Sequence, residues 1–136
     1  MASRQEPPTD AAASSDRSGT DASVPLLEIS NGIVALHKRY YGKGPESART
    51  HYHGDLVVVV LRGGFTRIEQ TLVEEGRGDV VLAQRRELQA AMDDRYKEIV
   101  REATGREVTA FMSANHHDPD LQVEIFLLGT PLVGQG

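Results

Sequence analysis

The stretch Leu56-Val57-Val58-Val59-Val60-Leu61 decides the fold, because it is the longest uninterrupted apolar run in the chain. A continuous apolar run of this length, bounded by turn residues, is typical of a β-strand whose two faces are both covered by other parts of the protein. It therefore predicts a central strand of a sheet. The run is far shorter than the ~20 residues that a membrane-spanning helix needs.

Segments on either side of this run predict two β-hairpins. Arg49–His53 is joined to the run by Gly54-Asp55, which is typical of a two-residue hairpin turn. Val108–Met112 and Leu121–Leu128 form the second hairpin, across a turn over Asn115–Asp120. In the last strand, apolar and polar positions alternate, which predicts one buried face. The alternating sets are Val123, Ile125 and Leu127 against Gln122, Glu124 and Phe126.

Three helices complete the predicted architecture. The first runs from about Pro25 to Tyr41, with apolar residues at steps of three and four. Thr66 and Glu69 fit a capping box that begins a short second helix. The third runs from about Asp79 to Ala103. The order α-β-β-α-α-β-β predicts an α+β fold, a four-stranded, mostly antiparallel sheet of two hairpins packed by three helices.

A length of 136 residues indicates one domain, and we expect an N-terminal tail before it. Residues 1–24 are rich in Ala, Ser, Asp and Pro, and we expect them to be disordered because they carry little apolar surface to bury. Residues 25–133 form the domain, and residues 134–136 are expected to fray.

Composition excludes several functional classes. There is no cysteine, so disulfides, thiolate metal sites and Cys nucleophiles are ruled out, and a reducing cytosol is the natural compartment. The net charge of -5 and the lack of a dense basic run disfavour nucleic acid as a partner. No segment is a signal peptide or a membrane span, so we expect no direct membrane insertion, and a peripheral membrane role would go through a partner.

A set of short motifs resembles the MpsC-like family. They are Ile29-Ser30-Asn31-Gly32-Ile33-Val34, Tyr40-Tyr41-Gly42-Lys43-Gly44-Pro45, Asp55 to Leu61, Thr66 to Leu72, Arg85-Arg86, Thr104-Gly105 and Phe111-Met112-Ser113. The resemblance covers about residues 27–128. It implies a bacterial domain named for a sodium-translocating, membrane-potential-generating system, whose partner proteins resemble an ion-pumping dehydrogenase subunit and a bicarbonate-handling protein. It supplies no catalytic residues.

Basic residues give the first candidate site. Gly42, Lys43 and Gly44 form a turn whose free amides and ammonium group suit a phosphate or bicarbonate, although the same residues also serve as a helix stop. Arg85 and Arg86 suggest an anion-responsive or partner-facing helix surface, against the alternative of a solvated face. Arg49 belongs to the same predicted set.

Histidines give the second candidate site. His51 and His53 are two apart on a strand and therefore point to one face. His116, His117 and Asp118 lie in the other hairpin turn, and if the two hairpins are adjacent these five residues could hold a metal ion. The alternative is a set of solvated turn side chains.

These patterns favour a non-catalytic accessory or regulatory domain that acts through protein contacts and needs no cofactor. A homodimer is expected, because a monomer would leave apolar area exposed on the long helix or at a sheet edge. A membrane protein complex is the other expected partner. The alternative is a small metal- or phosphate-dependent enzyme built on the histidines.

Overall fold

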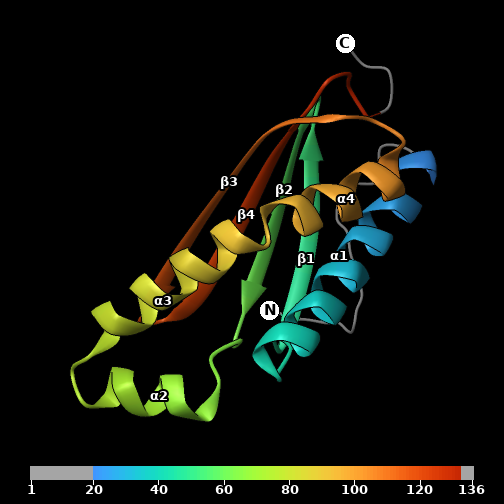
Figure 1. Ribbon diagram of the computed structural model, residues 1–136. Helices are drawn as coiled ribbons and strands as arrows, with labels where there is room; N and C mark the ends of the chain where they lie inside the picture. Colours follow the sequence, from blue (N-terminus) through green and yellow to red (C-terminus); the bar gives the residue numbers. More distant parts are fainter. Residues whose placement is uncertain (1–19, 133–136) are drawn as a thin grey trace.

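The computed structural model describes residues 20–132, with side chains described from Pro25 onward. These residues form four helices and four strands, which Figure 1 shows as one unit. In chain order they are α1 (Thr20–Tyr41), β1 (Ser47–His53), β2 (Leu56–Arg62), α2 (Arg67–Glu74), α3 (Gly78–Ala91), α4 (Asp93–Thr104), β3 (Val108–His117) and β4 (Asp120–Leu128). The α+β class is confirmed. Residues 1–19 of the expected tail and the whole expected frayed end, residues 134–136, lie outside the described residues. Helix α1 begins at Thr20, earlier than predicted.

The sheet has the order β1-β2-β4-β3, and every neighbouring pair is antiparallel. The apolar run Leu56–Leu61 is therefore part of an inner strand, as predicted. In the central pair, Leu56 lies beside Leu127 and Arg62 lies beside Leu121. This register places the turn of the first hairpin and the turn of the second hairpin at opposite ends of the sheet.

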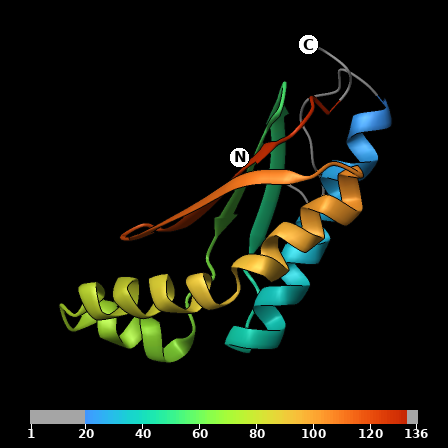
Figure 2. The same cartoon turned by 45° about the horizontal axis from the view of Figure 1, so that its top comes forward.

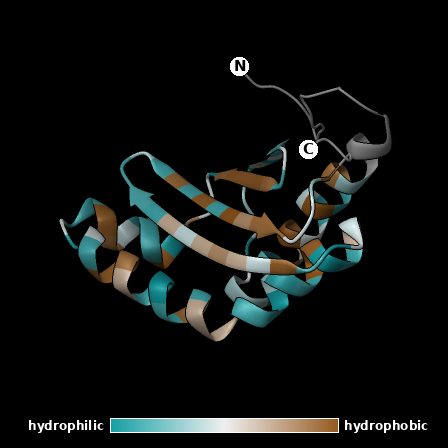
Figure 3. Ribbon diagram, turned by 90° about the horizontal axis from the view of Figure 1, so that it is seen from above, coloured by the Kyte–Doolittle hydropathy of each residue, from teal (hydrophilic) through white to brown (hydrophobic). Residues whose placement is uncertain are grey.

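All four helices lie on one side of the sheet (Figures 2 and 3). Helix α1 packs over β1, α3 lies along β3, and α4 contacts both α1 and β3. Helix α2 packs on α3. The domain therefore has two layers, and no helix of residues 20–132 covers the opposite face of the sheet.

The hydrophobic core fills the space between the two layers. Aliphatic residues from α1 and β2 meet the aromatic rings of Tyr96 and Phe126 there. Gly32 lets α1 approach α4 closely, since a Cβ at this position would lie 2.7 Å from Cγ2 of Ile99. The buried apolar set is Leu26, Ile29, Ile33, Leu36, Val57, Val59, Leu61, Met92, Tyr96, Val100, Phe126, Leu128 and Leu132.

The single helix predicted over residues 79–103 is wrong, because the structure divides it at Met92. The Met92 backbone N–H donates to the carbonyls of both Leu88 and Gln89, at 3.0 and 3.2 Å, as in a tightened last turn. The Met92 side chain is buried in the core. The break lets α3 follow β3 while α4 turns to pack on α1.

The prediction that both faces of Leu56–Leu61 are covered is also wrong for the described chain. Val57, Val59 and Leu61 are buried beneath the helices, whereas Val58 and Val60 point to the uncovered side and stay half-buried. One face of β4 is buried, as its alternation predicts, but the buried face is the one that carries Gln122, Glu124 and Phe126. The aliphatic face of β4 points away from the helices.

Candidate functional site

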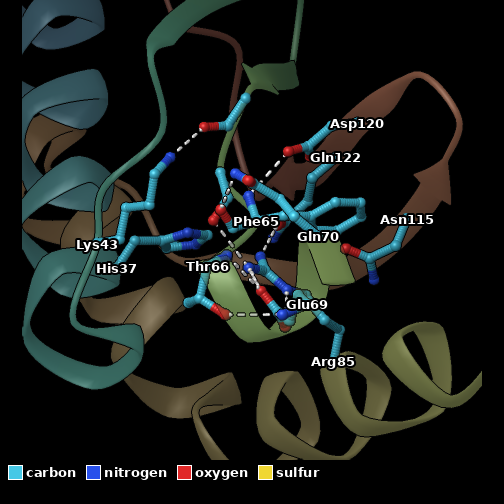
Figure 4. A network of polar contacts seen from close by, with 12 residues as sticks. His37, Lys43, Phe65, Thr66, Glu69, Gln70, Arg85, Asn115, Asp120 and Gln122 are labelled. Atoms are coloured by element: carbon cyan, nitrogen blue, oxygen red, sulfur yellow. Dashed lines mark hydrogen bonds and ion pairs between the residues drawn. The ribbon is translucent and has the colours of Figure 1, made fainter. Parts of the chain in front are cut away.

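A cluster of polar side chains lies inside the helix-covered layer, at the end of the sheet where β4 begins (Figure 4). Buried polar groups are stable only when they find partners, so such a cluster constrains the fold and is a candidate for function. Its buried members come from α1, α2, α3 and β4: His37, Glu69, Arg85, Gln89, Gln122 and Glu124.

Arg85 on α3 is the centre of this cluster and is only 1% exposed. Its Nε donates to Oε2 of Glu69 at 2.9 Å and its Nη2 donates to Oε1 at 2.6 Å, which makes a bidentate ion pair. Nη1 donates to Oε1 of Gln122 at 3.0 Å, and Nη2 also donates to the carbonyl of Gly64 at 3.0 Å. The guanidinium thus ties α2, β4 and the loop after β2 to one helix.

Aromatic rings complete the surroundings of the Arg85 guanidinium. It lies 3.9 Å from the ring centroid of Tyr41 and 5.2 Å from that of Phe65. Burial by itself lowers the pKa of Arg85, but the hydrogen bonds to Glu69 outweigh it and raise the pKa. Burial raises the pKa of Glu69, whereas the hydrogen bonds from Arg85 and from the Thr66 backbone lower it, and the net shift is downward. The pair therefore stays charged.

Local sequence explains how Glu69 reaches this position. Thr66 is the N-cap of α2, and the capping box is present as predicted, with Thr66 Oγ1 accepting from the Glu69 amide at 3.2 Å. The Glu69 carboxylate accepts from the Thr66 amide at 2.9 Å and binds Arg85 as well. One residue before the cap, the Phe65 amide donates to the Asp120 carboxylate at 2.8 Å. The helix start is therefore bound to the start of β4.

Glu124 is the least satisfied member of the cluster. It is 0% exposed, and its Oε2 accepts from Gln122 and, at 3.5 Å, from Gln89. Neither its Oε1 nor the Ser113 hydroxyl on the strand beside it makes a hydrogen bond of normal geometry, although Ser113 is near enough to lower the pKa of Glu124. Burial raises the pKa of Glu124 to about 7, against smaller opposing effects of Ser113, Gln122 and Arg85. This carboxyl therefore takes up or releases a proton near neutral pH.

His37 and Tyr96 form the other end of the cluster. His37 Nε2 and the Tyr96 hydroxyl share a hydrogen bond of 2.7 Å between α1 and α4. Burial, helped by the positive charge of Arg85, lowers the pKa of His37 to about 4. Burial raises the pKa of Tyr41 to about 12 and also raises that of Tyr96. At neutral pH these three side chains are uncharged.

The arrangement suits proton uptake more than nucleophilic chemistry. Gln89 and Asn115 exchange amide hydrogen bonds of 3.0 and 3.3 Å, so the side chains around Glu124 are held in place. In the described chain, Glu124 is the group in the cluster whose charge changes near pH 7, as its pKa of about 7 requires. Its ionisation would place a charge beside the fixed Arg85 and Glu69 pair.

The structure separates the basic residues that the sequence grouped together. Arg85 is not on a partner-facing surface, because its side chain is buried against Glu69. Arg86, the next residue of α3, is exposed, and Arg49 lies half-buried on β1. Lys43 Nζ donates to the carbonyl of Gly63 at 2.6 Å, so the Gly42-Lys43-Gly44 turn ties the end of α1 to the loop after β2. Lys43 and Arg85 converge on the Gly63-Gly64 loop.

The structure also separates the predicted metal ligands. His51 and His53 lie on the edge strand β1, next to the first hairpin turn, while His116 and His117 lie at the far end of the other edge strand, β3. His116 Nδ1 is 3.0 Å from the Pro119 carbonyl, and Asp118 is exposed in the turn. Over residues 20–132, no three His, Cys, Asp or Glu side chains gather to hold a metal ion.

Sequence reasoning missed most of the cluster. Glu69 was assigned only to a helix cap, and His37 and Gln89 carry no local signal that distinguishes them from surface residues. The polar set Gln122 and Glu124 on β4 did offer a signal, because it alternates with an aliphatic set. That pattern shows which residues share a face, but it does not show which face the helices cover.

The uncovered face of the sheet, here called the open face, is the second feature of functional interest. Its centre is aliphatic and half-buried, and its more exposed apolar residues are Leu127, at 37% exposure near one end of β4, and Met112, at 57% on the edge strand β3. Strand alternation assigns ten apolar residues to it: Leu56, Val58, Val60, Ala110, Met112, Ala114, Leu121, Val123, Ile125 and Leu127. Arg49 and Arg62 lie at its margin, and no Asp or Glu of the four described strands points to this side.

The described helices are not membrane spans, since none of those in residues 20–132 is both long and apolar enough to cross a bilayer.

Comparison with known proteins identifies the family. The family described as "Na+-translocating membrane potential-generating system (MpsC)" matches residues 26–130, which include every strand and most of every helix. A curated relative, "Uncharacterized protein YbcI" of Bacillus subtilis (strain 168), is 32% identical over 85 residues, covering 62% of this chain and 68% of the relative. No solved structure matches significantly. The chain therefore belongs to the MpsC family.

Proposed function

We propose that this protein is a non-catalytic accessory or regulatory domain that serves a Na+-translocating membrane-potential-generating system through protein contacts. Family membership supports the link to that system. The open face is the observation that carries the mode of action, because aliphatic residues on a sheet face are stable only when something covers them. The proposal is that the domain works by contact at this face.

The charged interior supports a structural role for the ionisable groups rather than a chemical one. Arg85 and Glu69 use their hydrogen bonds on one another and on the surrounding chain. Such a network holds one arrangement of the helices over the sheet. Bicarbonate handling, which the family resemblance brings in, would on this proposal belong to a partner protein.

The test is a complementation experiment in a host from which the gene has been deleted. Ile125→Glu places a charge in the centre of the open face, and Ile68→Glu is the matched control because Ile68 is 74% exposed on α2, in the helical layer. A potential-sensitive dye would measure the Na+-dependent part of the membrane potential. We expect the wild type and Ile68→Glu to restore it and Ile125→Glu to fail. Full restoration by Ile125→Glu, at equal protein level, would contradict the proposal.

A further inference from the structure

We propose that the open face is covered by the open face of a second copy of this chain, giving a dimer in which two four-stranded sheets pack face to face. The inference rests on the proposed use of this face for contact and names its first occupant. It commits to one geometry, in which β2 of each copy lies over β4 of the other.

The residue pattern of β2 is typical of a strand with a second cover. All six residues from Leu56 to Leu61 are aliphatic, which is typical of strands covered on both faces. The helices of the same chain cover only Val57, Val59 and Leu61. The alternate aliphatic positions of an inner strand are thus left for a cover from outside the described chain.

The orientation of β4 also favours a cover on the open face. Its polar residues Gln122 and Glu124 point into the domain, where they need a network of partners, while Val123 and Ile125 point outward. Burying polar groups while exposing aliphatic ones is unfavourable for a lone domain. The arrangement becomes favourable when the outward face is also an interior, as it is between two packed sheets.

The sizes of the outward residues and the area of the open face also fit a second copy. Side chains at the same height on β2 and β4 are of similar size: Leu56 with Leu127, Val58 with Ile125, and Val60 with Val123. A two-fold axis parallel to the strands and midway between β2 and β4 places each row over the other, which makes the face self-complementary. Four strands with seven paired residues span about 19 by 23 Å, so two copies bury about 900 Å² in projection, which is just below the ~1,000 Å² that a specific interface usually exceeds and fits a weak dimer.

Charge selects this axis over the other two-fold arrangement. An axis perpendicular to the strands would stack β1 of one copy on β1 of the other. The two basic strands that carry Arg49 would then face one another. The axis parallel to the strands instead lays β1 over β3, whose outward residues include Ala110, Met112 and Ala114. Arg62 then faces the Leu121 end of β4. No two arginines are stacked in that geometry.

The first experiment measures the mass of the full-length chain in solution by sedimentation over a range of concentrations. Given the modest area, we expect a reversible dimer with a dissociation constant of about 10 µM. Ile125→Glu should weaken the dimer at least about 100-fold, because the carboxylate would be buried without a partner. Ile68→Glu should leave it unchanged, and circular dichroism should show that both variants are folded.

The second experiment tests the geometry with introduced thiols, which is straightforward because the chain contains no cysteine. When Val60→Cys protein is mixed with Val123→Cys protein, a short bis-maleimide should cross-link the two variants to one another. The mixture should give more cross-linked dimer than either variant gives alone. A monomer at 200 µM, a dimer that survives Ile125→Glu, or a dimer without this mixed product would each overturn the inference. Any of these results could coexist with a positive membrane-potential assay, so failure here is distinguishable from failure of the proposed function.

Discussion

Glu124→Gln gives the sharpest test of the buried cluster. The substitution keeps the size of the side chain and an acceptor for Gln122 and Gln89, but it removes the charge that forms when Glu124 loses its proton. The folded-state pKa of Glu124 is raised from 4.5 to about 7 by burial. The stability that comes from keeping this carboxyl protonated is therefore fully present below about pH 4.5 and is lost as pH rises through about 7.

The size of the effect follows from that shift. A difference of 7 minus 4.5 corresponds to about 3 kcal/mol at about 1.4 kcal/mol for each pKa unit. The wild type should lose this amount relative to Glu124→Gln between about pH 4.5 and pH 8. For a domain of this size, about 3 kcal/mol corresponds to a change of about 10 °C in Tm. We therefore expect the variant to gain stability over the wild type as the pH rises.

The assay is urea unfolding of both proteins at about pH 4.5 and pH 8, with Glu87→Gln as a control on the exposed side of α3. The pKa of His37 is shifted by burial, Arg85 and Glu69, which all three proteins share, so the difference between them is expected to isolate Glu124. A constant difference between variant and wild type at both pH values would refute the reasoning. It would mean that Glu124 is ionised in the folded protein, or that the fold opens to hydrate it.

Three further outcomes follow from the same structure. Arg85→Met should lower the free energy of unfolding in urea by about 3–5 kcal/mol, because it leaves Glu69 buried without its partner. Adding Glu69→Gln should recover part of that loss. If the losses of the two substitutions simply add in the double variant, the ion pair is contradicted. The imidazole of His37, followed by NMR, should stay neutral as the pH is lowered to about 4. The stability that comes from the neutral ring is therefore lost as the pH falls from about 6.5 toward 4. A titration midpoint at 6.5 would show that the ring is hydrated. Gly32→Ala should lower the free energy of unfolding by about 1 kcal/mol, because the added Cβ would lie 2.7 Å from Ile99. In an Ile99→Ala background, where that contact is absent, the same substitution should stabilise the protein by a similar amount. Equal effects in both backgrounds would rule out the close contact.

The cluster and the open face are two consequences of one strand orientation. Because β4 alternates, turning Gln122 and Glu124 toward the helices necessarily turns Val123 and Ile125 away from them. Arg85 makes the inward polar face tolerable, since it donates to Gln122 and approaches Glu124 from α3. A substitution that disturbs the cluster is therefore expected to alter the open face through β4 as well.

The sequence by itself determined the parts of this protein that depend on neighbouring residues. The apolar run of β2, the Gly54-Asp55 turn and the capping box at Thr66 are local patterns, and the structure confirms all three. The order of elements and the α+β class follow from them. The family was also recognisable, because its motifs are short segments of sequence.

Only the tertiary structure decided what depends on distant residues. The strand order sends the two histidine pairs to opposite corners of the sheet, and the break at Met92 directs α3 and α4 to different partners. Arg85 looks like a surface residue in sequence, because Glu69 and Gln122, which hold it, lie 16 and 37 positions away. Alternation along β4 shows which residues share a face, but it does not show which of the two faces is buried. The energy of packing against α3 and α4 determines which face becomes the interior.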